Sequence, residues 1–207
     1  MVVLLFKQLP VLETMTIQPK HTLFVQRGTT MIEVLVTMVI LAFGLLGLIG
    51  LQGKMQLASF EAYQRAQAVV LLTDMVDRLN ANRLTADNFV SASVFGTGLT
   101  DASPCPAAVG PARDQCEWSV ALKGASETLS SANIGAIAGA RGCIARIQAP
   151  DATPGVCAPG IYLVTVAWQG MNSSVAPSAT CGTGLYGSEP LRRAISARVV
   201  VGKPECS

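Results

Sequence analysis

One carboxylate in this chain stands where an unpaired charge is costly. Glu33 lies directly before an uncharged run from Val34 to Gly53, and Arg27 and Gly28 come shortly before it. A carboxylate at the edge of a bilayer's apolar core costs on the order of a few kcal/mol unless it is paired. No cation lies within the run, so this pattern requires an ion pair with a group that the run itself does not supply.

Other side chains give little support for catalysis. His21 is the only histidine and precedes Gly28, so the later chain has no Ser-His-Asp triad, Cys-His pair or histidine metal ligand. The segment Gly182–Gly187 spells GxGxxG, but a predicted strand follows it where a nucleotide-binding loop needs a helix. Four aspartates form no convincing acid–base pair: Asp74, Asp77, Asp87 and Asp101. We therefore expect no enzyme activity, no cofactor and no metal site.

The composition fits a mostly soluble domain with one membrane segment. The chain has 207 residues, half of them are hydrophobic, and the formal net charge is +2. Charged residues make up only 14%, without a basic stripe or an acidic block. No nucleic-acid partner is therefore expected.

The uncharged run from Val34 to Gly53 is predicted to be a retained membrane anchor. As a helix it would span about 30 Å, which is the thickness of a bilayer's hydrocarbon core. Lys20 and Arg27 precede it, and only Lys54 follows it closely. This charge bias predicts a cytoplasmic N-terminus and an exported remainder.

Beyond the anchor the pattern stays helical. No proline occurs between Pro19 and Pro104, and apolar residues from Val69 to Leu79 repeat at three and four positions. We predict one helix from about Thr30 to Arg83. A helix of this length needs partners along its course.

The exported half is predicted to form a small sheet. Residues 85–111 are rich in Ser, Thr, Gly, Ala and Pro and indicate a loop, and residues 113–123 indicate a short helix. Strands are predicted at residues 142–148, 161–169 and 193–201. Three or four antiparallel strands packed on one long helix define an α+β fold.

The start of the anchor resembles a known processing signal. Arg27-Gly28-Thr29-Thr30-Met31-Ile32-Glu33 with the uncharged run is similar to the class III leader of type IV prepilins and type II secretion pseudopilins. This resemblance implies that a membrane aspartyl protease, the prepilin peptidase, cuts between Gly28 and Thr29 and methylates the new N-terminus. Glu33 would become the fifth residue and pair with the amine of a neighbouring subunit. Thr29 departs from the phenylalanine that is common at this place in major pilins.

The exported half also resembles one pilin family. The segments "MVDRLNANR", "GARGCIARIQ", "PGIYLVTVAWQG" and "VAPSATCGTGLYGSEPLRRAISARVVV" look like the PilV family of minor pilins, also called type IV pilus modification proteins. The likeness covers most of the chain after Gln26 and is weakest at residues 85–130. It implies a pilin-like fold, in which a long N-terminal helix, membrane-spanning in its first half, packs on a small antiparallel sheet.

The cysteines add a disulfide prediction. All six lie in the second half, without a CxxC motif, which favours disulfides in an exported head: Cys105, Cys116, Cys143, Cys157, Cys181 and Cys206. Six cysteines allow 15 pairings. Proximity along the chain suggests Cys105–Cys116, Cys143–Cys157 and Cys181–Cys206.

The resemblance implies a division of the chain into four parts. Residues 1–28 would be the cleaved leader, for which Met15 is an alternative start. Residues 29–53 would be the transmembrane and assembly helix, 54–84 its periplasmic continuation, and 85–207 the disulfide-containing head. The expected location is the inner membrane, single-pass with a periplasmic head, and then the pilus at the cell surface.

The resemblance also implies partners. These are the prepilin peptidase, the pilus assembly platform, other minor and major pilins, and a tip adhesin. The expected role is a minor pilin that enters or primes the assembly of type IV pili. Three alternatives stay open: a minor pseudopilin of type II secretion, a membrane-tethered adhesin or binding module that never polymerises, and a secreted enzyme.

Overall fold

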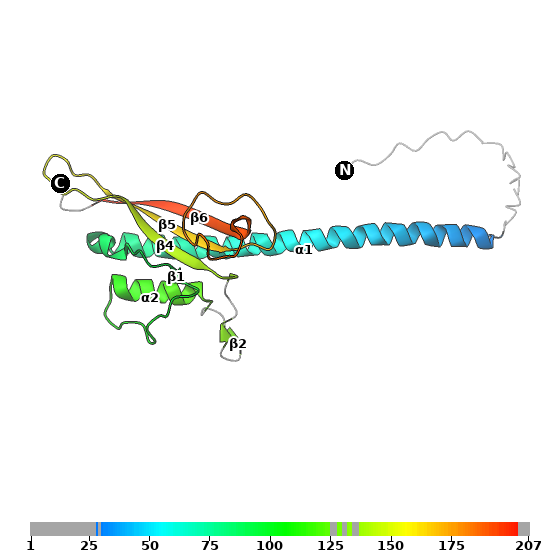
Figure 1. Ribbon diagram of the computed structural model, residues 1–207, viewed down its shortest axis with the longest axis horizontal. Coiled ribbons are helices and arrows are strands. Elements are labelled where there is room, and N and C mark those ends of the chain that lie inside the picture. The colour runs from blue at the N-terminus through cyan, green and yellow to red at the C-terminus, as the bar shows by residue number, and fades with distance from the viewer. Residues whose placement is uncertain (1–27, 29, 125–127, 130–131, 134–136, 203–207) are drawn as a thin grey trace, which may run out of the picture. The chain divides into compact units, whose positions relative to one another are not determined.

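The computed structural model describes residues 28, 30–124, 128–129, 132–133 and 137–202 (Figure 1). The chain divides into two compact units, Met1–Leu48 and Ile49–Ser207. The elements follow in this order: α1 (Met31–Ala81), the 3-10 helix η1 (Arg83–Phe89), β1 (Phe95–Gly96), α2 (Pro111–Leu122), β2 (Thr128–Leu129), β3 (Ala132–Asn133), β4 (Arg141–Gln148), β5 (Gly160–Gln169), the 3-10 helix η2 (Glu189–Leu191) and β6 (Arg192–Val201).

The predicted long helix is confirmed. Helix α1 is 51 residues long, and its ends lie within two residues of the predicted ones. It ends at Ala81, because Asn82 leaves helical geometry at φ −107° and ψ 45°. The backbone N–H and the side-chain amide of Asn82 still donate to the carbonyl of Arg78. These bonds satisfy a carbonyl that the end of a helix would otherwise leave without a partner.

Four strands form the main sheet, in the order β1-β4-β5-β6. All neighbours are antiparallel, and β5 pairs with β6 over ten consecutive positions. The three predicted strands correspond to β4, β5 and β6. The segment predicted to be a loop, residues 85–111, contains most of η1 and the short edge strand β1.

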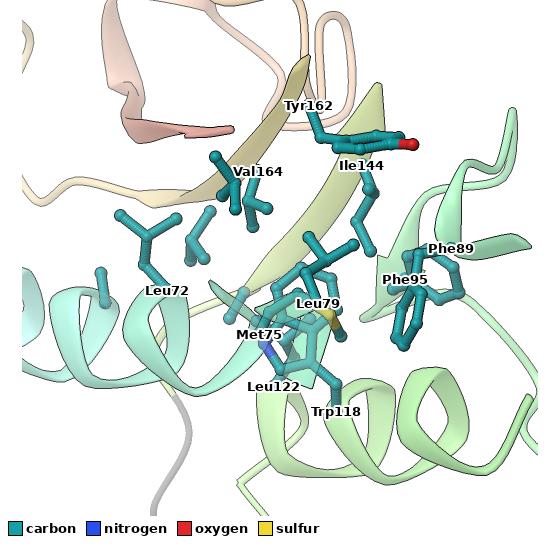
Figure 2. Packing of buried hydrophobic residues seen from close by; sticks show 14 of the residues in the cluster. Leu72, Met75, Leu79, Phe89, Phe95, Trp118, Leu122, Ile144, Tyr162 and Val164 are labelled. Atoms are coloured by element: carbon teal, nitrogen blue, oxygen red, sulfur yellow. The ribbon is translucent and has the colours of Figure 1, made fainter. Parts of the chain in front are cut away.

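The core lies between α1, α2 and one face of the sheet (Figure 2). Along β5, Tyr162, Val164 and Val166 alternate onto this face and are buried, as the two-residue period of a strand requires. The second half of α1 contributes its buried residues at intervals of three or four: Ala68, Leu72, Met75 and Leu79. This arrangement is the predicted α+β, pilin-like fold.

Helix α2 is attached to α1 through a buried ring and through ion pairs of Arg78 with Asp114 and Glu117. Trp118 is fully buried, and its indole N–H donates to the main-chain carbonyl of Leu71 at 2.8 Å. The ring lies against β4 at Gly142, where an added Cβ would overlap the ring and come within 2.8 Å of Leu122 Cδ1. Glycine is therefore required there by the close approach of α2 to the sheet.

The disulfides correct part of the predicted pairing. Cys105–Cys116 is confirmed. The predicted Cys143–Cys157 and Cys181–Cys206 bonds are wrong, because Cys143 is bonded to Cys181, with Cα atoms 5.8 Å apart. Cys157 is also disulfide-bonded, and Cys206 lies outside the described residues.

The antiparallel sheet explains this correction. Cys143 is the third residue of β4, and Cys157 lies beyond the end of that strand, at least about 16 Å further along it. The connection from β5 to β6 instead folds over the sheet face opposite the core, where Cys181 and Tyr186 pack on Ala167 and Ala194. Sequence proximity therefore selected the wrong partner.

One buried arginine holds this connection in place. Arg192 is only 3% exposed, and its guanidinium donates to the main-chain carbonyls of Pro177, Ala179 and Cys181. Its Nε also pairs with Glu189 at 2.7 Å. The buried charge is thus matched by a carboxylate and by backbone oxygens, as burial of an ion requires.

Candidate functional site

The predicted processing site lies at the start of α1. Gly28 and Thr30 are exposed, and Thr29 lies outside the described residues, as do His21 and the rest of the predicted leader. The backbone N–H of Glu33 donates to the Thr30 carbonyl at 3.0 Å, so Glu33 is held in the first helical turn. A carboxylate is favourable there because the helix dipole is positive at this end.

Glu33 has no cation within reach of its carboxylate in the described ranges. Glu33 is exposed, and it takes part in none of the ion pairs formed among the described residues. The predicted ion pair is therefore not formed within this part of the chain. The carboxylate is geometrically available to a group from outside.

The apolar part of α1 is exposed throughout. Every residue from Met31 to Phe60 is exposed, and the large apolar side chains include Leu35, Ile40, Phe43, Leu46 and Ile49. By length and composition, α1 is the one helix among the described residues that could cross a membrane. Side chains of this kind need a surrounding of lipid or of other helices to leave water.

The four glycines in this segment do not arise from crowding within the chain. An added Cβ at Gly44, Gly47, Gly50 or Gly53 would meet nothing within 4 Å. Each glycine lowers helix propensity by about 0.8–1 kcal/mol relative to alanine. The reason for these glycines lies either in contacts with other helices or in local unwinding of α1.

The GxGxxG segment and the aspartates that were considered for chemistry make structural contacts. In the GxGxxG segment the N–H of Gly184 donates to Glu189 at 2.7 Å, and a three-residue turn leads directly into β6. Asp87 accepts the Tyr162 hydroxyl, and Asp101 pairs with Lys123. Among the residues that the structure describes, no group of three His, Cys, Asp or Glu side chains could hold a metal ion.

One feature was missed by the sequence analysis. An open groove of about 440 Å³ lies between α1 and the start of β6. Its lining residues come from three elements: Ala58, Glu61, Ala62 and Arg65 of α1, Trp168 of β5, and Arg193, Ala194 and Ile195 of β6. Glu61 and Arg65 are visible in the sequence as a pair on one helix face, but only the sheet topology brings Arg193 beside them.

Comparison with known proteins does not assign the chain to a family. No known protein family, curated protein or solved structure matches the chain. Two features of the molecule bear on function: an exposed apolar helix that is joined to a disulfide-bonded head, and an exposed carboxylate at the start of that helix.

Proposed function

We propose that the chain is a minor pilin of the PilV type, anchored in the inner membrane by the first half of α1. The prepilin peptidase cuts between Gly28 and Thr29 and methylates Thr29. The released subunit then enters type IV pili or primes their assembly. The observation that carries this proposal is the exposed Glu33 at the start of an exposed apolar helix.

The charge of Glu33 needs a partner in the membrane. In lipid or in a helical bundle, an unpaired carboxylate is strongly destabilising. Cleavage after Gly28 would create an amine four residues before it, and a methylated amine keeps its positive charge. Pairing with the amine of a neighbouring subunit would place each helix at a fixed depth relative to the next.

The rest of the molecule fits the same role. The head would lie in the periplasm, an oxidising compartment in which disulfides persist. Among the described residues no group of three His, Cys, Asp or Glu side chains could hold a metal ion, and the proposal requires no chemistry from them. The expected partners are other minor and major pilins, the assembly platform and a tip adhesin.

The first test is the mass of the protein purified from its own membranes. We expect a chain that begins at Thr29 and carries one added methyl group at its N-terminus. A chain that retains Arg27 and Gly28 would contradict the proposal and leave a non-polymerising anchor. A type II secretion pseudopilin predicts the same processing, so the neighbouring genes must separate these two systems.

A second test isolates assembly from processing. In Glu33→Gln we expect cleavage to proceed while the protein accumulates in the membrane fraction and its amount in sheared filaments falls at least about tenfold, because the neutral amide cannot pair with the amine. Asp77→Asn is a matched control, since Asp77 is also an exposed acid on α1. Equal incorporation of both variants into filaments would contradict the role of Glu33.

A further inference from the structure

Strand β6 is an open edge of the sheet. It is the last strand in the order β1-β4-β5-β6, and it keeps unbroken register with β5 from Arg192 to Val201 (Figure 1). Alternate N–H and C=O groups of such a strand point away from its only neighbour. Within the described ranges, no backbone hydrogen bond joins residues 193–201 to a segment outside the sheet.

Strand β6 lacks several of the usual protections of an edge strand, although it carries the charged side chains of three arginines. It contains no proline and no bulge, and it is ten residues long, whereas the opposite edge strand β1 has two residues. Exposed edges of this length tend to pair with another chain unless they are blocked. The strand is therefore geometrically ready to accept a further strand.

The groove lies beside this edge. Residues Arg193–Ile195 of β6 form one wall, and α1 forms the other. Ala58 and Ala62 are small, so they leave space between the helix and the strand. Trp168, only 4% exposed, contributes an apolar surface. Side chains of an added strand that point toward the helix side of the sheet would enter this groove.

The charges of the groove and the strand favour an acidic partner. Arg193 is held by Glu61 at 3.5 Å and by the carbonyl of Asn172. Arg65 is exposed and forms no ion pair with another described residue. Strand β6 carries Arg198 as well and contains no acidic residue. Among the described residues of the groove, Arg65 is thus the cation left to pair with an acidic side chain of a partner.

We propose that β6 binds an extended segment of another protein as an added strand, with an acidic side chain of that segment facing Arg65. Main-chain hydrogen bonds would supply affinity, and the groove would supply selectivity. A second copy of β6 fits less well, because β6 contains no acidic residue that could face Arg65. This inference does not depend on the proposed function.

The test uses the full chain in detergent micelles and two synthetic peptides, TVEVTVEVT and TVKVTVKVT. Hydrogen exchange of the β6 amides, followed by mass spectrometry, reports strand addition directly. We expect the acidic peptide to slow exchange in Arg192–Val201 and the basic peptide to have no effect at the same concentration. Arg65→Glu should weaken binding of the acidic peptide about fivefold, on the scale of one exposed ion pair. Arg83→Glu, at another exposed arginine near the end of α1, should not weaken it.

Four outcomes would overturn the proposal. Slow exchange of all β6 amides in the free chain at every concentration would mean that the edge is already covered. Slowing that rises with protein concentration, without peptide, would identify a second copy as the partner. Equal effects of the two peptides would show that the edge does not select an acidic partner. An unchanged affinity of Arg65→Glu for the acidic peptide would show that Arg65 does not pair with it. The disulfides and circular dichroism of each variant verify that it is folded.

Discussion

At the scale of single residues, Tyr162 connects the sheet to the segment after α1. Its ring is buried, and its hydroxyl donates to Asp87 Oδ1 at 2.8 Å. Arg146 also pairs with Asp87, at 3.3 Å. Burial, together with the hydrogen bond to the Asp87 carboxylate, raises the pKa of Tyr162 to about 12. The neutral tyrosine is therefore part of the folded state.

This shift predicts an alkaline loss of stability. The folded pKa lies above the unfolded value of about 10, so the stabilisation from Tyr162 is complete below about pH 10. It is lost as the pH rises from about 10 through 12. In Tyr162→Phe we expect thermal unfolding to depend less on pH above about 10, as followed by circular dichroism. Burial also raises the pKa of Tyr186, so some dependence should persist.

Tyr63→Phe is the control for this measurement. Tyr63 is 54% exposed on α1, so its replacement should leave the alkaline slope as it is. If Tyr162→Phe also leaves the slope unchanged, the hydroxyl of Tyr162 does not contribute to alkaline unfolding.

At the scale of elements, the two described disulfides should differ in their contribution. Cys143–Cys181 closes a loop with a sequence separation of 38, and Cys105–Cys116 closes one of 11. Loop-closure entropy then gives about 4 kcal/mol for the first bond and about 3 kcal/mol for the second. We expect the Cys143→Ala/Cys181→Ala double variant to lose more unfolding free energy in urea than Cys105→Ala/Cys116→Ala. The reverse order would show that the entropy of the unfolded chain does not determine how much each disulfide stabilises the fold.

The elements also show how far the sequence could predict the fold. Apolar periodicity and the absence of proline located α1, β4, β5 and β6 to within two residues, because burial of one face imposes that pattern. Strand β1 and helix η1 were missed because they are short and lie in a segment rich in turn-forming residues. The bond between Cys143 and Cys181 was missed because it requires the β5–β6 connection to fold back over the sheet.

The candidate sites also differ in how far they can be predicted from the sequence. Gly28 and Glu33 could be proposed as site residues from the sequence because they lie within a few residues of each other beside an uncharged run. The groove could not, because Arg65 and Arg193 are 128 positions apart and line the same groove only where α1 packs beside the strand that pairs with β5. Local patterns are legible in a sequence, whereas contacts between distant strands depend on topology.

At the scale of the whole molecule, the head contains its own core. The second compact unit starts at Ile49, and every buried residue of α1 lies between Ala68 and Leu79. We expect a chain that begins at Lys54, exported to an oxidising compartment, to be soluble without detergent and to retain both described disulfides. Light scattering and disulfide mapping would check this result.

A shorter chain serves as the comparison. If it begins at Asn82, it lacks Ala68, Leu72, Met75 and Leu79, which form one side of the core, and it should fail to fold. Aggregation of the chain that begins at Lys54 would show that the apolar first half of α1 is needed by the head itself.

Arg192 has a consequence for how this protein can evolve. Its guanidinium recognises carbonyl oxygens of Pro177, Ala179 and Cys181, and every amino acid carries such an oxygen. Apart from Cys181, whose sulfur is bonded, these positions can therefore change identity without losing the contact. The backbone path of the β5–β6 connection is therefore fixed, while its side chains can be substituted. Mutation can change the chemistry of this surface without changing the fold beneath it.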